Sequence, residues 1–431
     1  MLLKKTNRFW KTGLAAISIM LKRYLYLPII FILFFLAGCS GATQKETQTA
    51  EDDSEVQVSE QNHGEETEDI SEAEEIAEVY SDIYNDSVES GTLGRLEVIR
   101  SIVKRLGDND YVAVDSENQI DMVGAEQARQ FCAQVDAKKG AELTIIEVSY
   151  LGGFTKYDFK TENGNVDIVR GYYQYENGHL EKMSRVRYSA DLWQYTEEGY
   201  LLFEGSYFSE AYYVLALSDA TERAALRVQP LDEKCRELNR QYIRPIGYSN
   251  NNMFLIDWSE SDFGNLDFYD LYDALYPLLN KQNVPYTADT NLGVGAVYQI
   301  AKDEFEGVIT SYFNIDSETL QSKAMYFMEN EVYEYRPRGL YEVEYSEIPY
   351  PEVVGYNENS DGTITLTVNA VYPNDSTSKA YAHEVVIRPL ADGSFQYVSN
   401  RMISSENNYE MWWHSDRLTE EEWKKYYGGS E

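Results

Sequence analysis

The sequence predicts an α+β protein of two domains, each with helices followed by an antiparallel β-meander. Two observations carry this prediction. Apolar residues first recur at helical spacing and then alternate at the period of strands, and Asn-Gly and Asp-Gly pairs separate the alternating segments. Helices precede strands in both halves of the chain, which is typical of the α+β class.

The chain divides into four parts along its length. Residues 1–38 form a predicted export signal, residues 39–69 a predicted acidic linker, and residues 70–228 and 229–431 the two domains. The linker has Lys45 as its only basic residue and almost no apolar side chains, so it cannot bury enough surface to fold. We therefore expect a disordered stalk, extended by the mutual repulsion of its acids.

Three helices are expected at the start of the first domain. They begin near Ser71, which matches a capping box, and at Thr92–Leu106 and Ala125–Lys139. Gly107 and Gly140 follow the second and third helices, where glycine commonly ends a helix. The third helix has an apolar face made of Ala128, Phe131, Cys132 and Val135.

Six strands follow in the first domain. The expected strands are Glu142–Tyr150, Phe154–Thr161, Val166–Tyr175, Leu180–Ser189, Leu192–Thr196 and Tyr200–Phe208. Asn163-Gly164 and Asn177-Gly178 predict hairpin turns, because both central residues of such turns need a positive φ. Residues 209–228 fit neither period clearly, and the domain boundary is placed at their end.

The second domain repeats the order of helices and strands. Helices are expected from Pro230 to Arg244, at Leu266–Tyr276 and at Asp303–Phe313, with a buried strand at Met253–Trp258. The later strands are Val332–Arg336, Pro351–Tyr356, Thr363–Tyr372, Lys379–Arg388 and Ser394–Met402. A last helix is expected after Thr419, which forms a capping box with Glu422.

The first residues carry the features of an export signal. Basic side chains precede an apolar run at Leu25–Leu36, which is shorter than the roughly 20 residues that span a bilayer. The run ends in Leu-Ala-Gly-Cys39, which resembles the lipobox of bacterial lipoproteins. That resemblance implies that Cys39 becomes the first residue and carries a diacylglyceryl group with fatty acids such as palmitate. Met20 is an alternative start, and an uncleaved membrane anchor is the alternative fate of the leader.

Compartment and charge follow from the same segment. Basic residues before the apolar run stay inside, which predicts an extracytoplasmic, lipid-anchored location at the cell membrane. Six of the 37 basic residues and none of the 73 acidic residues precede Cys39, so the remainder has a formal charge of −42. This charge argues against nucleic acid as a partner. Cys132 and Cys235 are expected to be buried free thiols, with a disulfide between them as the alternative.

Catalytic motifs are weak in this sequence. His383-Glu384 begins like the HExxH motif of zinc proteases, but the second histidine is missing and the segment is an expected strand. The chain has four histidines, which is few for acid–base or metal chemistry. A pair of carboxylates of the glycosidase type is the remaining catalytic alternative, because 73 acids always offer some pair at a workable separation.

One acidic segment is a candidate calcium site. Its candidate ligands are Asp257, Glu260, Asp262 and Asp267, since Ca²⁺ prefers several carboxylate oxygens. The EF-hand spacing fails, because Asp262 stands where that loop needs glycine. The alternative is a solvated acidic face.

Aromatic residues provide the candidate binding surface. Tyr173, Tyr175, Trp412 and Trp413 could stack on a glycan or hold a partner protein. The alternative is that these rings belong to half-buried sheet faces, where tyrosine is common.

Three stretches carry a wider resemblance: Gly247–Asp273, Pro349–Leu390 and Met411–Trp423. They resemble a family of uncharacterised lipoproteins from Gram-positive, clostridia-like bacteria, which implies a Gram-positive surface and adds no site residues. The sequence thus predicts a lipid-anchored surface protein that binds an envelope or extracellular partner, protein or glycan. A surface hydrolase with a carboxylate pair is the alternative, and an accessory role in envelope assembly or DNA transfer rests on the resemblance alone.

Overall fold

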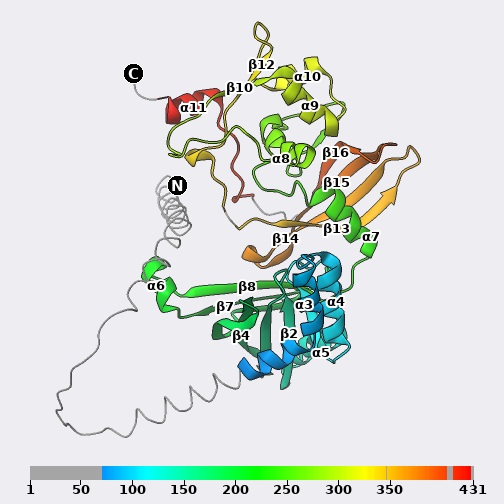
Figure 1. The fold of residues 1–431 in the computed structure, drawn as a ribbon, viewed down its shortest axis with the longest axis vertical. Helices are drawn as coiled ribbons and strands as arrows, with labels where there is room; N and C mark the ends of the chain where they lie inside the picture. The colour runs from blue at the N-terminus through cyan, green and yellow to red at the C-terminus, as the bar shows by residue number, and fades with distance from the viewer. Residues whose placement is uncertain (1–69, 346, 405–410, 429–431) are drawn as a thin grey trace, which may run out of the picture. The chain divides into compact units, whose positions relative to one another are not determined.

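The computed structural model describes residues 70–345, 347–404 and 411–428 (Figure 1). The described chain forms two compact units. The first contains the residues up to Leu192 together with Glu204–Glu222, and the second contains Trp193–Phe203 and the chain from Arg223 onward. Both units combine helices with mainly antiparallel sheets, which confirms the predicted α+β class. No helix among the described residues has the length and apolar character needed to cross a membrane.

Helices cover one side of the first unit (Figure 1). They are the helical residues 70–78, α3 (Ser81–Glu89), α4 (Leu96–Gly107) and α5 (Ala125–Asp136). The predicted face of α5 is confirmed, since Ala128, Phe131, Cys132 and Val135 are all buried. The predicted start of α4 at Thr92 is wrong, because residues 92–95 form a turn that precedes the helix.

The sheet of the first unit has the order β1-β2-β3-β4-β5. Its strands are β1 (Val112–Asp115), β2 (Ala141–Val148), β3 (Phe154–Glu162), β4 (Asn165–Glu176) and β5 (His179–Ser189). The predicted meander β2–β5 is confirmed, and Asn163 and Asn177 have the positive φ that their hairpin turns require. The parallel strand β1 was not predicted.

The next sheet has three strands, and the bounds of the two units fall within these strands. Its strands are β6 (Leu192–Tyr195), β7 (Tyr200–Tyr207) and β8 (Ala220–Arg227). Helix α6 (Glu210–Ala216) connects β7 to β8. From Arg223 onward the chain belongs to the second unit, whereas the domain boundary was predicted at 228/229. Residues 193–203 also belong to the second unit, which was not predicted.

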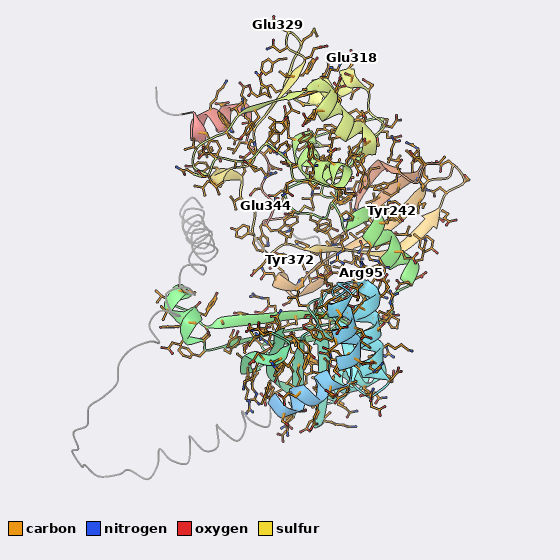
Figure 2. All side chains as sticks on the ribbon, viewed as in Figure 1. Arg95, Tyr242, Glu318, Glu329, Glu344 and Tyr372 are labelled. Carbon is orange, nitrogen blue, oxygen red and sulfur yellow. The ribbon has the colours of Figure 1, made fainter. Side chains whose placement is uncertain are left out.

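The helices of the second unit largely match the predicted periodicities. They are α7 (Glu233–Leu238) with the following π-turn η1 (Asn239–Ile243), α8 (Phe268–Asn280), α9 (Lys302–Tyr312), α10 (Ser317–Lys323), η2 (Leu340–Glu342), η3 (Pro373–Asp375) and α11 (Glu420–Tyr427). Thr419 caps α11 as predicted, and only α10 and the short η2 and η3 were not predicted. Tyr242 of η1, labelled in Figure 2, meets the edge of Phe395 with ring centroids 4.8 Å apart.

Two sheets complete the second unit. The larger one has the order β13-β14-β15-β16-β9, and the smaller one β10-β12-β11. Their strands are β9 (Trp258–Ser259), β10 (Tyr298–Ala301), β11 (Tyr326–Phe327), β12 (Val332–Tyr335), β13 (Tyr350–Glu358), β14 (Ile364–Tyr372), β15 (Thr377–Pro389) and β16 (Phe395–Ile403). The predicted strand Met253–Trp258 is wrong: its residues 253–255 and Trp258 are buried, but the segment turns back so that the Trp258 Nε1–H donates to the Met253 carbonyl at 2.8 Å.

Each unit has a core of its own. The core of the first unit joins helix residues such as Ile99 and Ile102 to Ile146 and Phe154 of the sheet. The core of the second unit is rich in rings, among them Phe268, Tyr272, Phe305, Tyr333 and Tyr397. Cys132 and Cys235 are both buried and free, so the predicted unpaired thiols are confirmed. Two buried rings of the second unit, Phe268 on α8 and Tyr335 on β12, belong to elements that also form the pocket of this unit.

Candidate ligand pocket

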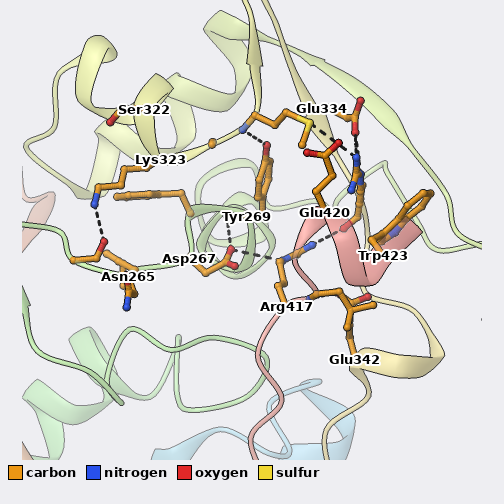
Figure 3. A pocket seen from close by; sticks show the side chains of 17 residues that line it. Asn265, Asp267, Tyr269, Ser322, Lys323, Glu334, Glu342, Arg417, Glu420 and Trp423 are labelled. Carbon is orange, nitrogen blue, oxygen red and sulfur yellow. Dashed lines mark hydrogen bonds and ion pairs between the residues drawn. The ribbon is translucent and has the colours of Figure 1, made fainter. Parts of the chain in front are cut away.

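The second unit contains a pocket of about 640 Å³ beside the first turn of α8 (Figure 3). Its walls come from the loop before α8, the end of α10, β12 with the residue after it, and α11 with the segment before it. We call it the α8–α11 pocket and define it by Asn265, Asp267, Tyr269, Lys323, Glu334, Arg336, Arg417, Glu420 and Trp423. Its volume lies within the roughly 300–1,000 Å³ that small-molecule sites occupy.

Asp267 lies at the base of the pocket because it caps α8. Its Oδ1 accepts hydrogen bonds from the backbone N–H groups of Tyr269 and Asp270 at 2.9 and 3.0 Å. Aspartate is a preferred N-cap residue, since its carboxylate satisfies free N–H groups of the first turn. Burial raises the pKa of Asp267, Asp270 raises it further, and Arg417 opposes both effects.

Arg417 pairs with three acids on one face of α8. Its guanidinium lies 2.7 Å from Asp270, 3.0 Å from Asp273 and 3.6 Å from Asp267, measured between the nearest nitrogen and oxygen atoms. Arg338 adds a bidentate pair to Asp270, with distances of 2.9 and 2.7 Å. Burial alone would lower the pKa of Arg417, but the three carboxylates raise it well above its usual value. This network fixes one wall of the pocket.

Arg336 and Trp423 also line the pocket. Trp423 lies on the far side of Arg417 from Asp267 in the view of Figure 3. The guanidinium carbon of Arg336 lies 4.5 Å from the Trp423 ring centroid, and its Nε donates to Glu334 at 2.8 Å. Gly295 backs the same indole, because a Cβ there would lie 2.3 Å from the Trp423 ring. The buried Trp423 Nε1 has no hydrogen-bond partner among the residues that the structure describes, so it is a donor that a ligand or water could satisfy.

The other charged groups at the pocket are also paired. Lys323 donates to the Gly264 carbonyl at 2.7 Å, and Glu420 pairs with Lys424 one turn along α11. Glu342 accepts from the backbone N–H groups of Leu418 and Gly339 at 3.1 and 3.2 Å. Each charged side chain that lines the pocket thus has a partner within the described chain. Such an arrangement is suited to holding a ligand by hydrogen bonds.

Three of the four proposed calcium ligands do not line this pocket, and each of the three is bonded to a different partner. Asp257 accepts from the Met402 N–H at 2.6 Å, Glu260 forms a bidentate pair with Arg388, and Asp262 accepts from the Gly264 N–H at 3.0 Å. Only Asp267 belongs to the pocket. The described residues contain no group of three or more histidine, cysteine or acidic side chains arranged to hold a metal. Calcium binding therefore stays a prediction from the sequence.

None of the four aromatic candidates lines the pocket. Tyr173 is fully buried against Phe154, and Tyr175 is half-buried with its ring stacked on Tyr84. Trp413 is buried, whereas Trp412 is 43% exposed and donates its Nε1 to Asp375 at 3.1 Å.

Arg336, Arg417 and Trp423 were not predicted as site residues from the sequence. Asp267 was found through its acidic segment, but its partner Arg417 lies far along the chain. The capping box at Thr419 was the one local signal near this wall, since it predicted the helix that carries Trp423. His383 is fully buried on β15, and the neighbouring Glu384 pairs with Arg401, so the HExxH-like pair is part of the fold.

Cys39 lies outside the described residues, so its lipidation is not addressed by the structure. Among curated proteins and among solved structures, no match was found. A family model does match residues 66–417, which include most of the described part of both units and the pocket up to Arg417 but not α11. The match covers most of the chain. The protein therefore belongs to the family of unknown function DUF6070.

Proposed function

We propose that this chain is a lipid-anchored binding protein on the extracytoplasmic face of the cell membrane, and that its ligand occupies the α8–α11 pocket. The anchor would be the diacylglyceryl group on Cys39, and the ligand an envelope or extracellular molecule. The observation that carries the binding role is a pocket of about 640 Å³ whose charged side chains are already paired. A binding site needs such fixed donors and acceptors, and needs no group that changes protonation.

The chemistry of the walls favours a polar ligand. The pocket offers carboxylate oxygens from Glu334 and Glu420, the side-chain amide of Asn265, and the indole N–H of Trp423. The lining thus combines donors and acceptors, so a ligand with hydroxyl or amide groups fits better than an apolar one. Sugars and short peptides from the cell envelope have such groups.

A carboxylate-pair hydrolase remains the second candidate, with weaker support. General acid catalysis at neutral pH needs a carboxyl group with a raised pKa beside a second carboxylate. Asp267 meets the first condition through burial. Asp270, the acid that raises the pKa of Asp267, is held by Arg338 and Arg417, and the pKa of Glu420 is lowered by Lys424. These pairings favour binding over catalysis.

The test uses the chain from Gly41 onward, which retains every described residue. Pull-down against cell-wall material identifies the ligand, and calorimetry with soluble glycan and peptide fractions measures its affinity. Trp423→Ala removes the pocket wall and should weaken binding at least about tenfold. Trp412→Ala is the matched control, because this exposed tryptophan lies outside the pocket.

A second variant separates binding from folding. Asn265 is exposed on the pocket wall, so Asn265→Lys places a long side chain at the opening without disturbing the core. It should weaken binding while the thermal unfolding midpoint stays unchanged. Equal affinity in the parent chain, Trp423→Ala and Asn265→Lys would overturn the pocket as the binding site. Release of sugar from a glycan panel would favour the hydrolase.

A further inference from the structure

Helix α6 lies at the tip of the β7–β8 connection (Figure 1). A cluster of large apolar side chains is exposed on it and beside it. The cluster comprises Phe208, Tyr212, Tyr213, Val214, Leu215 and Leu217, which are between 36% and 78% exposed. The helix has no buried residue. Soluble proteins rarely expose a contiguous group of this kind unless it has a binding role.

The apolar side chains surround the helix on all sides. Successive helical residues are about 100° apart, so Tyr212, Tyr213, Val214 and Leu215 point in four directions. A helix that docks in a protein groove has one apolar face and one polar face. A helix that is apolar all round fits an environment that contacts every side, as the acyl-chain region of a bilayer does.

Leu217 adds an independent observation. It ends α6 with φ of 54° and ψ of 33°, in the left-handed region, and its side chain is 78% exposed. This position at a helix end is usually glycine or asparagine, because a side chain with a Cβ is strained there. This conformation closes the helix, because the Leu217 N–H donates to the Tyr213 carbonyl at 2.8 Å. It also leaves an apolar side chain exposed at a strained backbone position. Strain of this kind is found at functional positions.

We propose that the α6 tip, residues 208–217, inserts into the interfacial region of a lipid bilayer. The seven residues of α6 extend about 10 Å, which matches the roughly 5–10 Å depth of interfacial insertion and is far too short to span. Tyr212 and Tyr213 have the amphipathic rings that favour the interface, with an apolar body and a polar hydroxyl.

Charge indicates which lipid surface the tip accepts. Residues 204–222 contain four acids, Glu204, Glu210, Asp219 and Glu222, and no lysine or arginine. The attraction must therefore come from apolar burial, and anionic head groups would oppose it. Zwitterionic phosphatidylcholine is the suitable probe.

The inference uses the proposed Cys39 anchor only to bring the tip near a membrane. The described chain begins at Ile70 in the same unit as α6, and about 30 residues separate it from Cys39. An extended segment of that length reaches at most about 100 Å, which is long enough for a domain-sized unit to turn its tip toward the bilayer. The experiment omits the anchor, so that failure of this inference is distinct from failure of the lipoprotein proposal.

Flotation with phosphatidylcholine vesicles tests the insertion. The chain from Gly41 onward should float with the vesicles, and Leu217→Asp should lower its partition coefficient at least about tenfold. Aspartate tolerates the left-handed conformation better than leucine, so this variant should fold normally. Leu151→Asp is the matched control, since Leu151 is 60% exposed on another turn of the same unit and should leave flotation unchanged.

A fluorescent label reports the depth of insertion. Val214→Cys can be labelled selectively because Cys132 and Cys235 are buried. An environment-sensitive fluorophore there should shift to the blue with vesicles and be quenched by lipids labelled in the acyl chain. The same label at His179→Cys, at the exposed start of β5, should not respond.

Four results would overturn the inference. They are absence of flotation, flotation that Leu217→Asp does not change, flotation that requires phosphatidylglycerol, and a concentration-dependent dimer that Leu217→Asp abolishes. The last would assign the α6 tip to contact with a second copy of the chain.

Discussion

At the scale of single residues, the second unit depends on charged pairs between distant parts of the chain. Arg417 is 9% exposed and contacts Asp270, which is 2% exposed and also holds Arg338. Isolated buried charges are costly, so each member of this network depends on its partners. The acids at the start of α8 thus form one half of a charge network, and Arg338 and Arg417 supply the basic half.

Arg417→Met should destabilise the protein by about 3–5 kcal/mol, because it leaves Asp270 and Asp273 with less compensation in a buried setting. Urea unfolding measures this change. Arg401→Met is the matched control: Arg401 pairs with Glu384 and its side chain is 65% exposed, so the loss should stay below about 1 kcal/mol. A loss as small as the control's would show that the network contributes little to stability.

His383 should make stability depend on pH. Its side chain is fully buried, with Nε2 3.0 Å from the Tyr248 hydroxyl and Nδ1 2.7 Å from the Asn400 amide oxygen. Burial lowers its pKa from 6.5 to about 4, against the opposing effect of the Asn400 hydrogen bond. The unfolded state therefore binds the proton first as the pH falls. Stability is full above pH 6.5 and is lost as the pH falls toward 4, by on the order of 3 kcal/mol.

Urea titrations at pH 7, 6, 5 and 4 measure this dependence. His383→Gln should flatten the loss between pH 6.5 and 4, although it also lowers stability at pH 7. His179→Gln, on the exposed end of β5, should keep the slope of the parent chain. An unchanged slope in His383→Gln would contradict the assignment of this dependence to His383.

At the scale of secondary-structure elements, segments with a clear period or flanking turn signals were predicted well, including the four-residue strands β6 and β12, whereas β1 and the segment 253–258 were not. The face of α5 and the turns at Asn163 and Asn177 were predicted because repeated local signals agree there. β1 has only four residues, all buried, which gives no alternation to detect. Residues 253–258 were mistaken for a strand, since a short apolar run shows burial but does not specify backbone direction.

The Thr419 cap should control the local stability of α11. Its hydroxyl accepts from the Glu422 N–H, while the Glu422 carboxylate accepts from the Thr419 N–H at 3.0 Å. Thr419→Ala should cost about 1 kcal/mol and speed amide exchange in α11 roughly fivefold. Because α11 carries Trp423, ligand affinity should fall as well. Hydrogen exchange followed by mass spectrometry measures the effect.

Thr310→Ala is the control for this prediction. Thr310 lies inside α9 and its hydroxyl bonds to the Glu306 carbonyl one turn earlier, so it caps no helix end. Exchange in α9 should stay the same or slow slightly, because alanine favours helix interiors. Equal exchange of α11 in the parent chain and in Thr419→Ala would contradict a stabilising cap.

At the scale of the whole molecule, the candidate pocket could not be derived from the sequence. Its walls join residues from 264 to 423, and no local pattern pairs Asp267 with Arg417 or Arg336 with Trp423. Composition identified the acidic segment but not the basic residues that neutralise it. The high number of aromatic residues likewise did not locate a binding surface, since Tyr173 and Trp413 are buried while Trp412 is exposed.

Cys39 is the proposed attachment site of the chain to the membrane. Two or more acyl chains hold a protein stably on a bilayer, whereas one chain binds only marginally. Cys39→Ala should therefore leave the membrane fraction, whereas Ser40→Ala, the neighbouring control, should remain in it. Mass spectrometry of the native product should find a first residue at Cys39 with the mass of a diacylglyceryl group. A free thiol, or a leader still attached, would contradict the anchor while leaving the pocket and the α6 tip to be tested separately.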